Sequence, residues 1–104
     1  MIRNAFKMKL KPGFTEEYKN RHDKIWPELV RLLRESGIYN YSIYLDEEID
    51  TLFAYQELND DNTVDEIPYD PIIQKWWYQN KDLMDCNPDN SPVITPLKEL
   101  FFMS

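Results

Sequence analysis

Residues 38–58, IYNYSIYLDEEIDTLFAYQEL, decide the fold that this sequence predicts. Two runs rich in aromatic and β-branched residues, 38–46 and 51–58, are separated by the four residues 47–50. Such runs favour β-strands, and a connection of this length is typical of an antiparallel hairpin. The two strands are therefore expected to pair directly with each other.

The residues before this hairpin predict one strand and a broken helix. Residues 1–10 alternate polar and apolar side chains, which is the period-2 pattern of a half-buried strand. Thr15 is a candidate N-cap for a helical region whose apolar side chains recur at helical spacing. Pro27 should kink or restart this helix near Trp26, because proline lacks an amide hydrogen, and Gly37 should end the second stretch.

The residues after the hairpin complete the order βαββαβ. A short helix is expected around 64–67, a second main helix should begin at Pro71 and extend as far as Met84, and 97–103 reads as a last strand. This order predicts an α+β fold of the ferredoxin-like type, an antiparallel sheet with helices on one face. A chain of 104 residues is expected to form one domain, 1–104.

The composition argues against several partners and sites. A net charge of -7 disfavours nucleic acids and anionic membrane surfaces, and no apolar run approaches the ~20 residues of a membrane span. One cysteine, Cys86, excludes an intrachain disulfide, and one Cys with one His excludes zinc sites built from these residues within a chain. Residues 1–10 lack the apolar core of a signal peptide, so we expect a cytoplasmic protein.

The strand 51–58 carries apolar side chains on both of its faces. Leu52 and Ala54 point to one face, whereas Phe53 and Tyr55 point to the other. The helices can cover only one face of a sheet this small. We therefore expect a second copy to pack on the other face, giving a homodimer.

His22 is the only histidine in the chain, and it lies one helical turn from both Tyr18 and Trp26. Because the unperturbed pKa of histidine lies near neutrality, this pattern indicates proton transfer beside an aromatic wall. A structural histidine among apolar neighbours is the alternative. A thiol nucleophile at Cys86 with His22 as its base has no local sequence signature.

Trp76 and Trp77 are adjacent, and neighbouring helical positions point about 100° apart, so one of them should line a cavity or an interface. The pair either fills the core or forms a platform for the apolar face of a sugar. Tyr41, expected on one strand face with Tyr39 and Ile43, could add a phenol, or could simply favour the strand. The polar loop 87–92 should form turns or order the edge of a pocket.

Taken together, these segments resemble the L-rhamnose mutarotase family over nearly the whole chain, although residues 60–73 depart from its pattern. The motifs that carry the resemblance are Met1–Arg3, Ala5 and Phe6; Glu16–Tyr18, Arg21, His22 and Ile25–Leu29; Asn40, Tyr41 and Ile43–Asp46; Trp76 and Trp77; and Asn87–Val93.

The resemblance implies a dimeric α/β-barrel of the ferredoxin-like type that interconverts the α and β anomers of L-rhamnopyranose in rhamnose utilisation. It implies that His22 is the proton donor and that Tyr18, Tyr41, Trp76 and Trp77 contact the monosaccharide. Ring opening and closure need one proton delivered to the ring oxygen and one removed from the C1 hydroxyl, so no cofactor and no metal is implied. The base that partners His22 is left open.

Two other classes share this topology. A haem-binding or monooxygenase-like barrel could use His22 as an axial ligand. A non-catalytic sugar-binding barrel would use the same aromatic side chains without turnover. Neither class explains the combined pattern of His22, the tryptophan pair and the loop 87–92.

Overall fold

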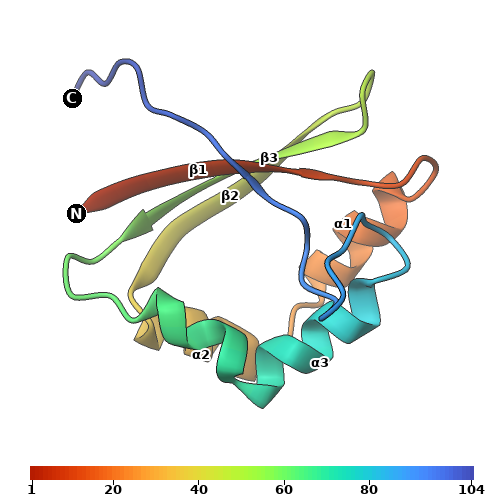
Figure 1. Ribbon diagram of the computed structural model, residues 1–104, viewed down its shortest axis with the longest axis horizontal. Helices are drawn as coiled ribbons and strands as arrows, with labels where there is room; N and C mark the ends of the chain where they lie inside the picture. Colours follow the sequence, from red (N-terminus) through yellow and green to blue (C-terminus); the bar gives the residue numbers. More distant parts are fainter.

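The computed structural model describes residues 1–104, which form a four-stranded antiparallel sheet with helices on one face (Figure 1). The strands lie in the order β2, β3, β1, β4. In chain order the elements are β1 (Ile2–Lys9), α1 (Thr15–Asp23), α2 (Pro27–Glu35), β2 (Ile38–Asp46), β3 (Thr51–Leu58), the 3₁₀ helix η1 (Val64–Tyr69), α3 (Pro71–Asn80) and β4 (Thr95–Pro96). This order and this pairing confirm the predicted ferredoxin-like α+β arrangement.

The hairpin forms with the predicted bounds, and its two strands pair antiparallel from Ile38 opposite Leu58 to Asp46 opposite Thr51. Its second strand, β3, also pairs along its whole length with β1, so it lies at the centre of the sheet. The side chains of β3 alternate accordingly. Leu52 and Ala54 are buried beneath the helices, whereas Phe53 lies on the opposite, uncovered face.

α1 and α2 are the two halves of the predicted broken helix. Pro27 is the first residue of α2, where its missing amide hydrogen costs no helical hydrogen bond. Gly37 follows α2 and has φ 99°, a conformation that favours glycine at a helix end. A Cβ atom at this position would lie only 2.9 Å from the Cβ of Asn62. Glycine therefore ends this helix, as expected. The prediction for Thr15 is wrong by one position. Helix α1 already includes Thr15, and Phe14 occupies the N-cap without a side-chain hydrogen bond.

The second half of the chain follows the prediction less closely. The short helix expected at 64–67 is the 3₁₀ helix η1, and α3 begins at its predicted proline with Asp70 as N-cap, whose carboxylate accepts the Ile72 amide at 2.8 Å. Met84 does not belong to this helix as predicted. It forms an isolated antiparallel bridge with Leu10, because α3 ends four residues earlier.

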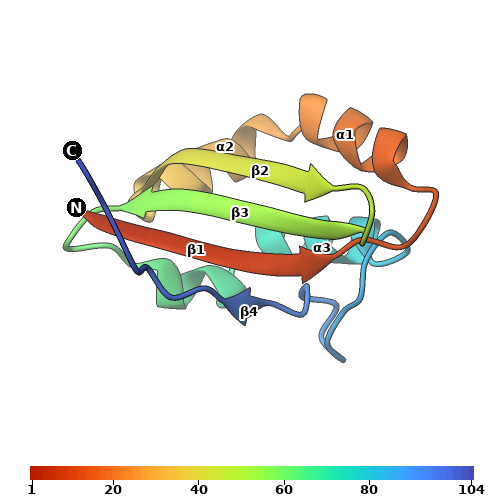
Figure 2. The ribbon, with the colours of Figure 1, turned by 90° about the horizontal axis from the view of Figure 1, so that it is seen from above.

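The last strand is much shorter than predicted and lies earlier in the chain. Residues 97–103 do not form a strand; β4 consists of Thr95–Pro96 on the free edge of β1. Pro96 has no amide hydrogen and therefore cannot donate a hydrogen bond to β1. After Pro96, the Leu97 amide donates a hydrogen bond to the Ala5 carbonyl oxygen of β1 at 2.9 Å. Beyond it the chain leaves the sheet edge as an exposed tail (Figure 2).

Two clusters of buried side chains form the core between sheet and helices. The first comprises Met8, Leu10, Tyr18, Leu52, Ala54, Leu83 and Met84, and the second comprises Leu29, Ile38, Leu58, Ile67, Ile73 and Trp76. The opposite sheet face carries no helix (Figures 1 and 2). No helix in the structure combines the length and the apolar character needed to cross a bilayer.

Candidate active site

A cavity of about 750 Å³ lies between the sheet and the helices, and members of both core clusters line it. All five predicted site residues, His22, Tyr18, Tyr41, Trp76 and Trp77, line this one cavity. They come from three different elements, α1, β2 and α3. The fold therefore brings together residues that are up to 59 positions apart in the chain, from Tyr18 to Trp77.

Helix α1 places Tyr18 and His22 one turn apart, on the same face. Their rings stack with centroids 4.2 Å apart and an interplanar angle of 30°. The Nδ1 atom of His22 lies 2.9 Å from the Tyr18 carbonyl oxygen. Since a carbonyl oxygen can only accept, Nδ1 must donate its proton in this bond, and the neutral imidazole then has its free lone pair on Nε2.

Trp76 closes the other side of the imidazole. The Trp76 and His22 rings pack edge to face, with centroids 5.3 Å apart and an interplanar angle of 83°. The Trp76 and Trp26 rings also pack edge to face, with centroids 5.2 Å apart. Trp76 is 8% exposed, whereas Trp77 is partly buried and also lines the cavity. The two tryptophans differ in burial, but both line the cavity, whereas their neighbouring helical positions required this of only one. Trp26 was expected beside His22 in this aromatic wall, but in the structure its ring contacts Trp76 and it does not line the cavity.

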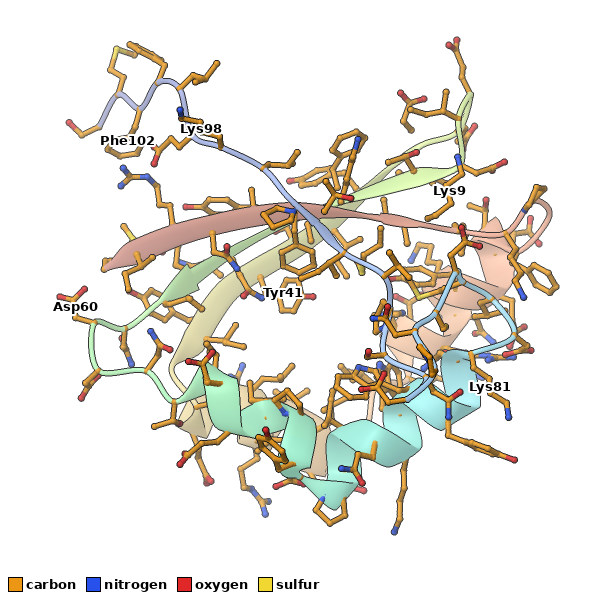
Figure 3. The ribbon with its side chains drawn as sticks, in the orientation of Figure 1. Lys9, Tyr41, Asp60, Lys81, Lys98 and Phe102 are labelled. Carbon is orange, nitrogen blue, oxygen red and sulfur yellow. The ribbon has the colours of Figure 1, made fainter.

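Tyr41 enters the cavity because of a β-bulge in β2. The register of the hairpin shifts between Tyr39 and Ser42, and Asn40 within this segment has φ 49°. An extra residue in one strand redirects a side chain, and Tyr41 points into the space between sheet and helices (Figure 3). Of the two residues expected to share a face with Tyr41, Ile43 does so, opposite the buried Ala54. Tyr39 pairs with Glu57 before the bulge and so belongs to the other face of the strand, although it still contributes to the edge of the cavity.

Burial sets the protonation states of these groups. It lowers the pKa of His22 and outweighs the hydrogen bond to the Tyr18 carbonyl and the Asp23 carboxylate, both of which raise that pKa. Tyr41 is 39% exposed, but loss of hydration within the cavity raises its pKa to about 12. Burial, followed by the proximity of Tyr41, raises the pKa of Tyr18. At neutral pH the site therefore contains an uncharged imidazole and two protonated phenols.

The loop 87–92 forms turns and also borders the cavity. The Ser91 amide donates to the Asp89 carboxylate at 3.0 Å, which is an Asx turn. The Ser91 hydroxyl donates to the same carboxylate, and the hydroxyl first and the amide second lower the pKa of Asp89. Asn90, with φ 71°, lines the cavity. Cys86 lines the cavity as well, but burial raises the pKa of its thiol, which disfavours a thiolate nucleophile.

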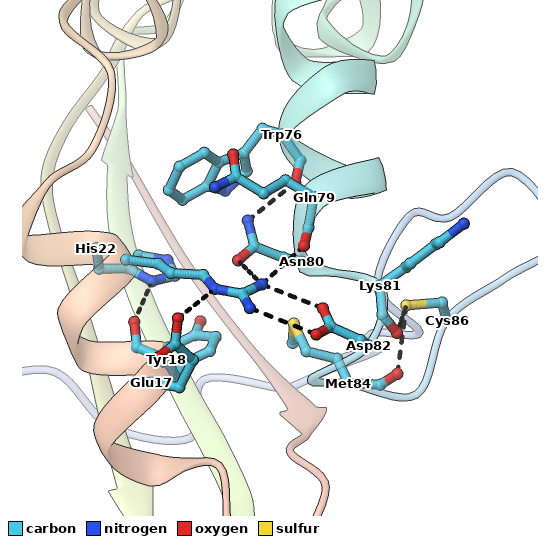
Figure 4. Close-up of polar contacts among 11 residues, drawn as sticks. Glu17, Tyr18, His22, Trp76, Gln79, Asn80, Lys81, Asp82, Met84 and Cys86 are labelled. Atoms are coloured by element: carbon cyan, nitrogen blue, oxygen red, sulfur yellow. Dashed lines mark hydrogen bonds and ion pairs between the residues drawn. The ribbon is translucent and has the colours of Figure 1, made fainter.

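A polar network behind the cavity was not predicted from the sequence. Arg21 on α1 contacts the C-terminal end of α3 and the residues that follow, and the buried Asn80 takes part in these contacts (Figure 4). The partners of Arg21 on and after α3 lie far from it in the sequence, so no local sequence pattern indicated these contacts.

No three His, Cys, Asp or Glu side chains lie close enough together to form a metal site.

The chain matches known proteins along its whole length. The protein-family model described as L-rhamnose mutarotase matches residues 3–103. An L-rhamnose mutarotase of Flavobacterium johnsoniae is 53% identical over 98% of this chain and 95% of its own length. One from Phocaeicola vulgatus is 50% identical over 99% of each chain. The crystal structure of L-rhamnose mutarotase from Formosa agariphila is 48% identical, covers 100% of both chains and superposes with a TM-score of 0.93.

Proposed function

The chain belongs to the L-rhamnose mutarotase family, and we propose on this basis that it interconverts the α and β anomers of L-rhamnopyranose. It is accordingly an isomerase that acts on a monosaccharide. The family match over residues 3–103 carries this proposal. The cytoplasm remains the predicted compartment.

We propose that a single nitrogen, Nε2 of His22, moves the proton in both halves of the reaction. The C1 hydroxyl and the ring oxygen are bonded to the same carbon, so one base can reach both. Nε2 takes the proton from the C1 hydroxyl, the bond between C1 and the ring oxygen breaks as C1 becomes an aldehyde, and Nε2 returns the proton to the ring oxygen. Rotation of the aldehyde and the reverse sequence close the ring in the other anomer.

The contacts of His22 support this assignment. The bond from Nδ1 to the Tyr18 carbonyl holds the tautomer in which Nε2 is unprotonated, and the stacked Tyr18 ring and the edge of Trp76 restrict rotation of the imidazole. His22 then protonates the ring oxygen with the proton that it took from the C1 hydroxyl. In this proposal no separate base partners His22, because the same imidazole serves in both steps.

The other four predicted site residues are proposed to bind the sugar. With raised pKa values, Tyr18 and Tyr41 keep their phenolic protons and can donate hydrogen bonds to sugar oxygens. Trp76 and Trp77 offer aromatic surface for the apolar C–H face of the pyranose.

Anomer exchange at equilibrium tests the activity directly. Saturation transfer in the NMR spectrum of L-rhamnose, between the anomeric protons of the two anomers, gives the exchange rate. We expect this rate to rise in proportion to the concentration of the protein. No acceleration on L-rhamnose, fucose, galactose or ribose would contradict the proposed activity and favour the sugar-binding or haem-binding alternatives.

The pH dependence follows from the lowered pKa of His22. The neutral imidazole is the active form, and its population decreases when the pH falls through this pKa. We therefore expect the catalysed rate to be constant through neutral pH and to fall only below pH 6.5, the ordinary pKa of histidine. The ring protons of the sole histidine can be titrated by NMR. A midpoint above 6.5, or a catalysed rate that rises on acidification, would contradict this assignment.

We further propose that the chain forms a homodimer through the uncovered face of its sheet. Tyr44 is 68% exposed on this face and lies opposite Phe53, which is 36% exposed. Exposed aromatic patches of this kind mark interaction surfaces. Light scattering after size exclusion should give twice the mass of one chain for the wild type. The variant Phe53→Asp should give the mass of a single chain. A monomeric wild type at micromolar concentration would contradict the proposal.

A further inference from the structure

Arg21 joins the helix that carries His22 to the helix that carries Trp76. Its Nη1 donates to the carbonyl oxygen of Gln79 at 2.7 Å, to Asp82 Oδ1 at 3.1 Å and to Asn80 Oδ1 at 3.5 Å, and its Nη2 donates to Asp82 Oδ2 at 3.4 Å. Nε donates to Glu17 Oε1 on its own helix at 2.8 Å. One guanidinium group thus connects α1 to the end of α3, and Figure 4 shows its labelled partners Glu17, Gln79 and Asp82 around it.

The contact at Gln79 has a physical reason. The last carbonyl groups of a helix have no partner within it, and the helix dipole makes this end negative. The guanidinium cation of Arg21 donates hydrogen bonds to a free carbonyl group and places a positive charge at the negative end of the helix. The Asp82 carboxylate beside it is a second negative partner. The pKa of Asp82 is lowered by Arg21, so this pair stays ionised at neutral pH.

The network continues from Arg21 to the wall of the cavity. Asn80 is buried and lies between the guanidinium and the backbone of Trp76, where its Nδ2 donates to the Trp76 carbonyl oxygen at 2.9 Å. Arg21 itself does not line the cavity, whereas Trp76 and Asn80 do. Any influence of Arg21 on the reaction must therefore pass through the placement of the helices.

Helix α1 has few other attachments to the rest of the fold. Of its nine residues, Tyr18 alone is buried, and the half-buried His22 contacts the Trp76 ring edge to face. Arg21, whose side chain is 19% exposed, adds a polar attachment between α1 and the end of α3 and directly precedes His22.

We propose that Arg21 is a positioning residue that sets the His22 ring against the edge of Trp76. This inference rests on the proposed function for its effect on turnover, but its structural part stands independently. Because Tyr18 and His22 share one helix, loss of Arg21 should leave their stacking intact. It should change the contact with Trp76, which belongs to the other helix.

The test compares Arg21→Ala with Arg31→Ala. Arg31 is an exposed arginine of α2 that makes no side-chain hydrogen bond and no ion pair, so it controls for the loss of an arginine. We expect Arg21→Ala to lower kcat by about 10- to 100-fold, the cost of misplacing a catalytic group by about 1 Å, with a smaller change in KM. Arg31→Ala should keep the wild-type kcat. Arg21→Lys keeps the positive charge but loses the planar guanidinium group that donates to several acceptors at once. Its kcat should therefore lie between those of Arg21→Ala and the wild type.

The NMR signals of the sole histidine ring separate positioning from stability. Their shifts contain the ring-current contribution of Trp76, so Arg21→Ala should move them while Arg31→Ala should not. If Arg21→Ala does not fold, Asp82→Asn, which weakens the same contact, should shift these signals in the same direction. Unchanged histidine signals and unchanged kcat in a folded variant with a lower urea midpoint would overturn the proposal. If the wild type does not accelerate anomer exchange, the proposed function fails, and the histidine signals still decide whether Arg21 positions the ring.

Discussion

Replacing His22 with alanine is expected to lower the catalysed rate of anomer exchange by about 10²- to 10⁴-fold, the usual contribution of a general acid or base. The expected effect is large because the proposed mechanism routes both proton transfers through one imidazole nitrogen. No other residue that lines the cavity combines a pKa below neutrality with a position between Tyr18 and Trp76. Saturation transfer with saturating L-rhamnose measures the loss directly.

His22→Asn is the matched control for this variant. The amide nitrogen of asparagine is bonded to Cγ, as the imidazole Nδ1 is, so it can still donate to the Tyr18 carbonyl oxygen, but it cannot accept and return a proton near neutral pH. Both variants should therefore lose turnover, and His22→Asn should retain the hydrogen bond that His22→Ala loses. Wild-type turnover in either variant would remove His22 from the reaction, whatever the fold of the protein.

The sequence was most informative where structure is decided locally. The hairpin has the predicted bounds because strand propensity, the polar connection and the alternation all point to the same structure. Pro27 and Gly37 act through their own backbone geometry, so their positions also follow from the sequence. The last strand was misplaced because apolar character in 97–103 resembles a strand, whereas the sheet edge accepts only the short segment Thr95–Pro96.

The site was predictable in part for the same reason. Tyr18 and His22 meet because they are one turn apart on a helix, which the sequence alone indicates. Tyr41 was named both from its place in an aromatic strand and from the family resemblance, but its route into the cavity depends on a bulge that strand alternation does not predict. Arg21 and Asp82 are separated by 61 positions, and no periodic pattern indicates such a contact.

Replacing Trp76 with alanine should destabilise the protein and weaken sugar binding together. Its ring is 8% exposed and contacts both His22 and Trp26, so its loss leaves a void beside the imidazole. Large aromatic to alanine changes in a core cost about 3–5 kcal/mol, which is a large fraction of the ~5–15 kcal/mol that stabilises a typical domain. Urea denaturation measures the first effect, and the KM for L-rhamnose in anomer exchange measures the second.

Two variants on the same helix make this result interpretable. Trp76→Phe keeps an aromatic ring and most of the buried volume, so it should fold and show a smaller rise in KM together with a reduced kcat, because the edge contact that restrains His22 is altered. Tyr78→Ala removes an exposed ring from α3 that contacts Lys81 outside the cavity, and it should change neither stability nor KM appreciably. Equal effects of Trp76→Ala and Tyr78→Ala would show that Trp76 is neither a core residue nor a wall of the site. The contrast arises because positions 76 and 78 of α3 point to different surroundings, one to the cavity and the other to solvent.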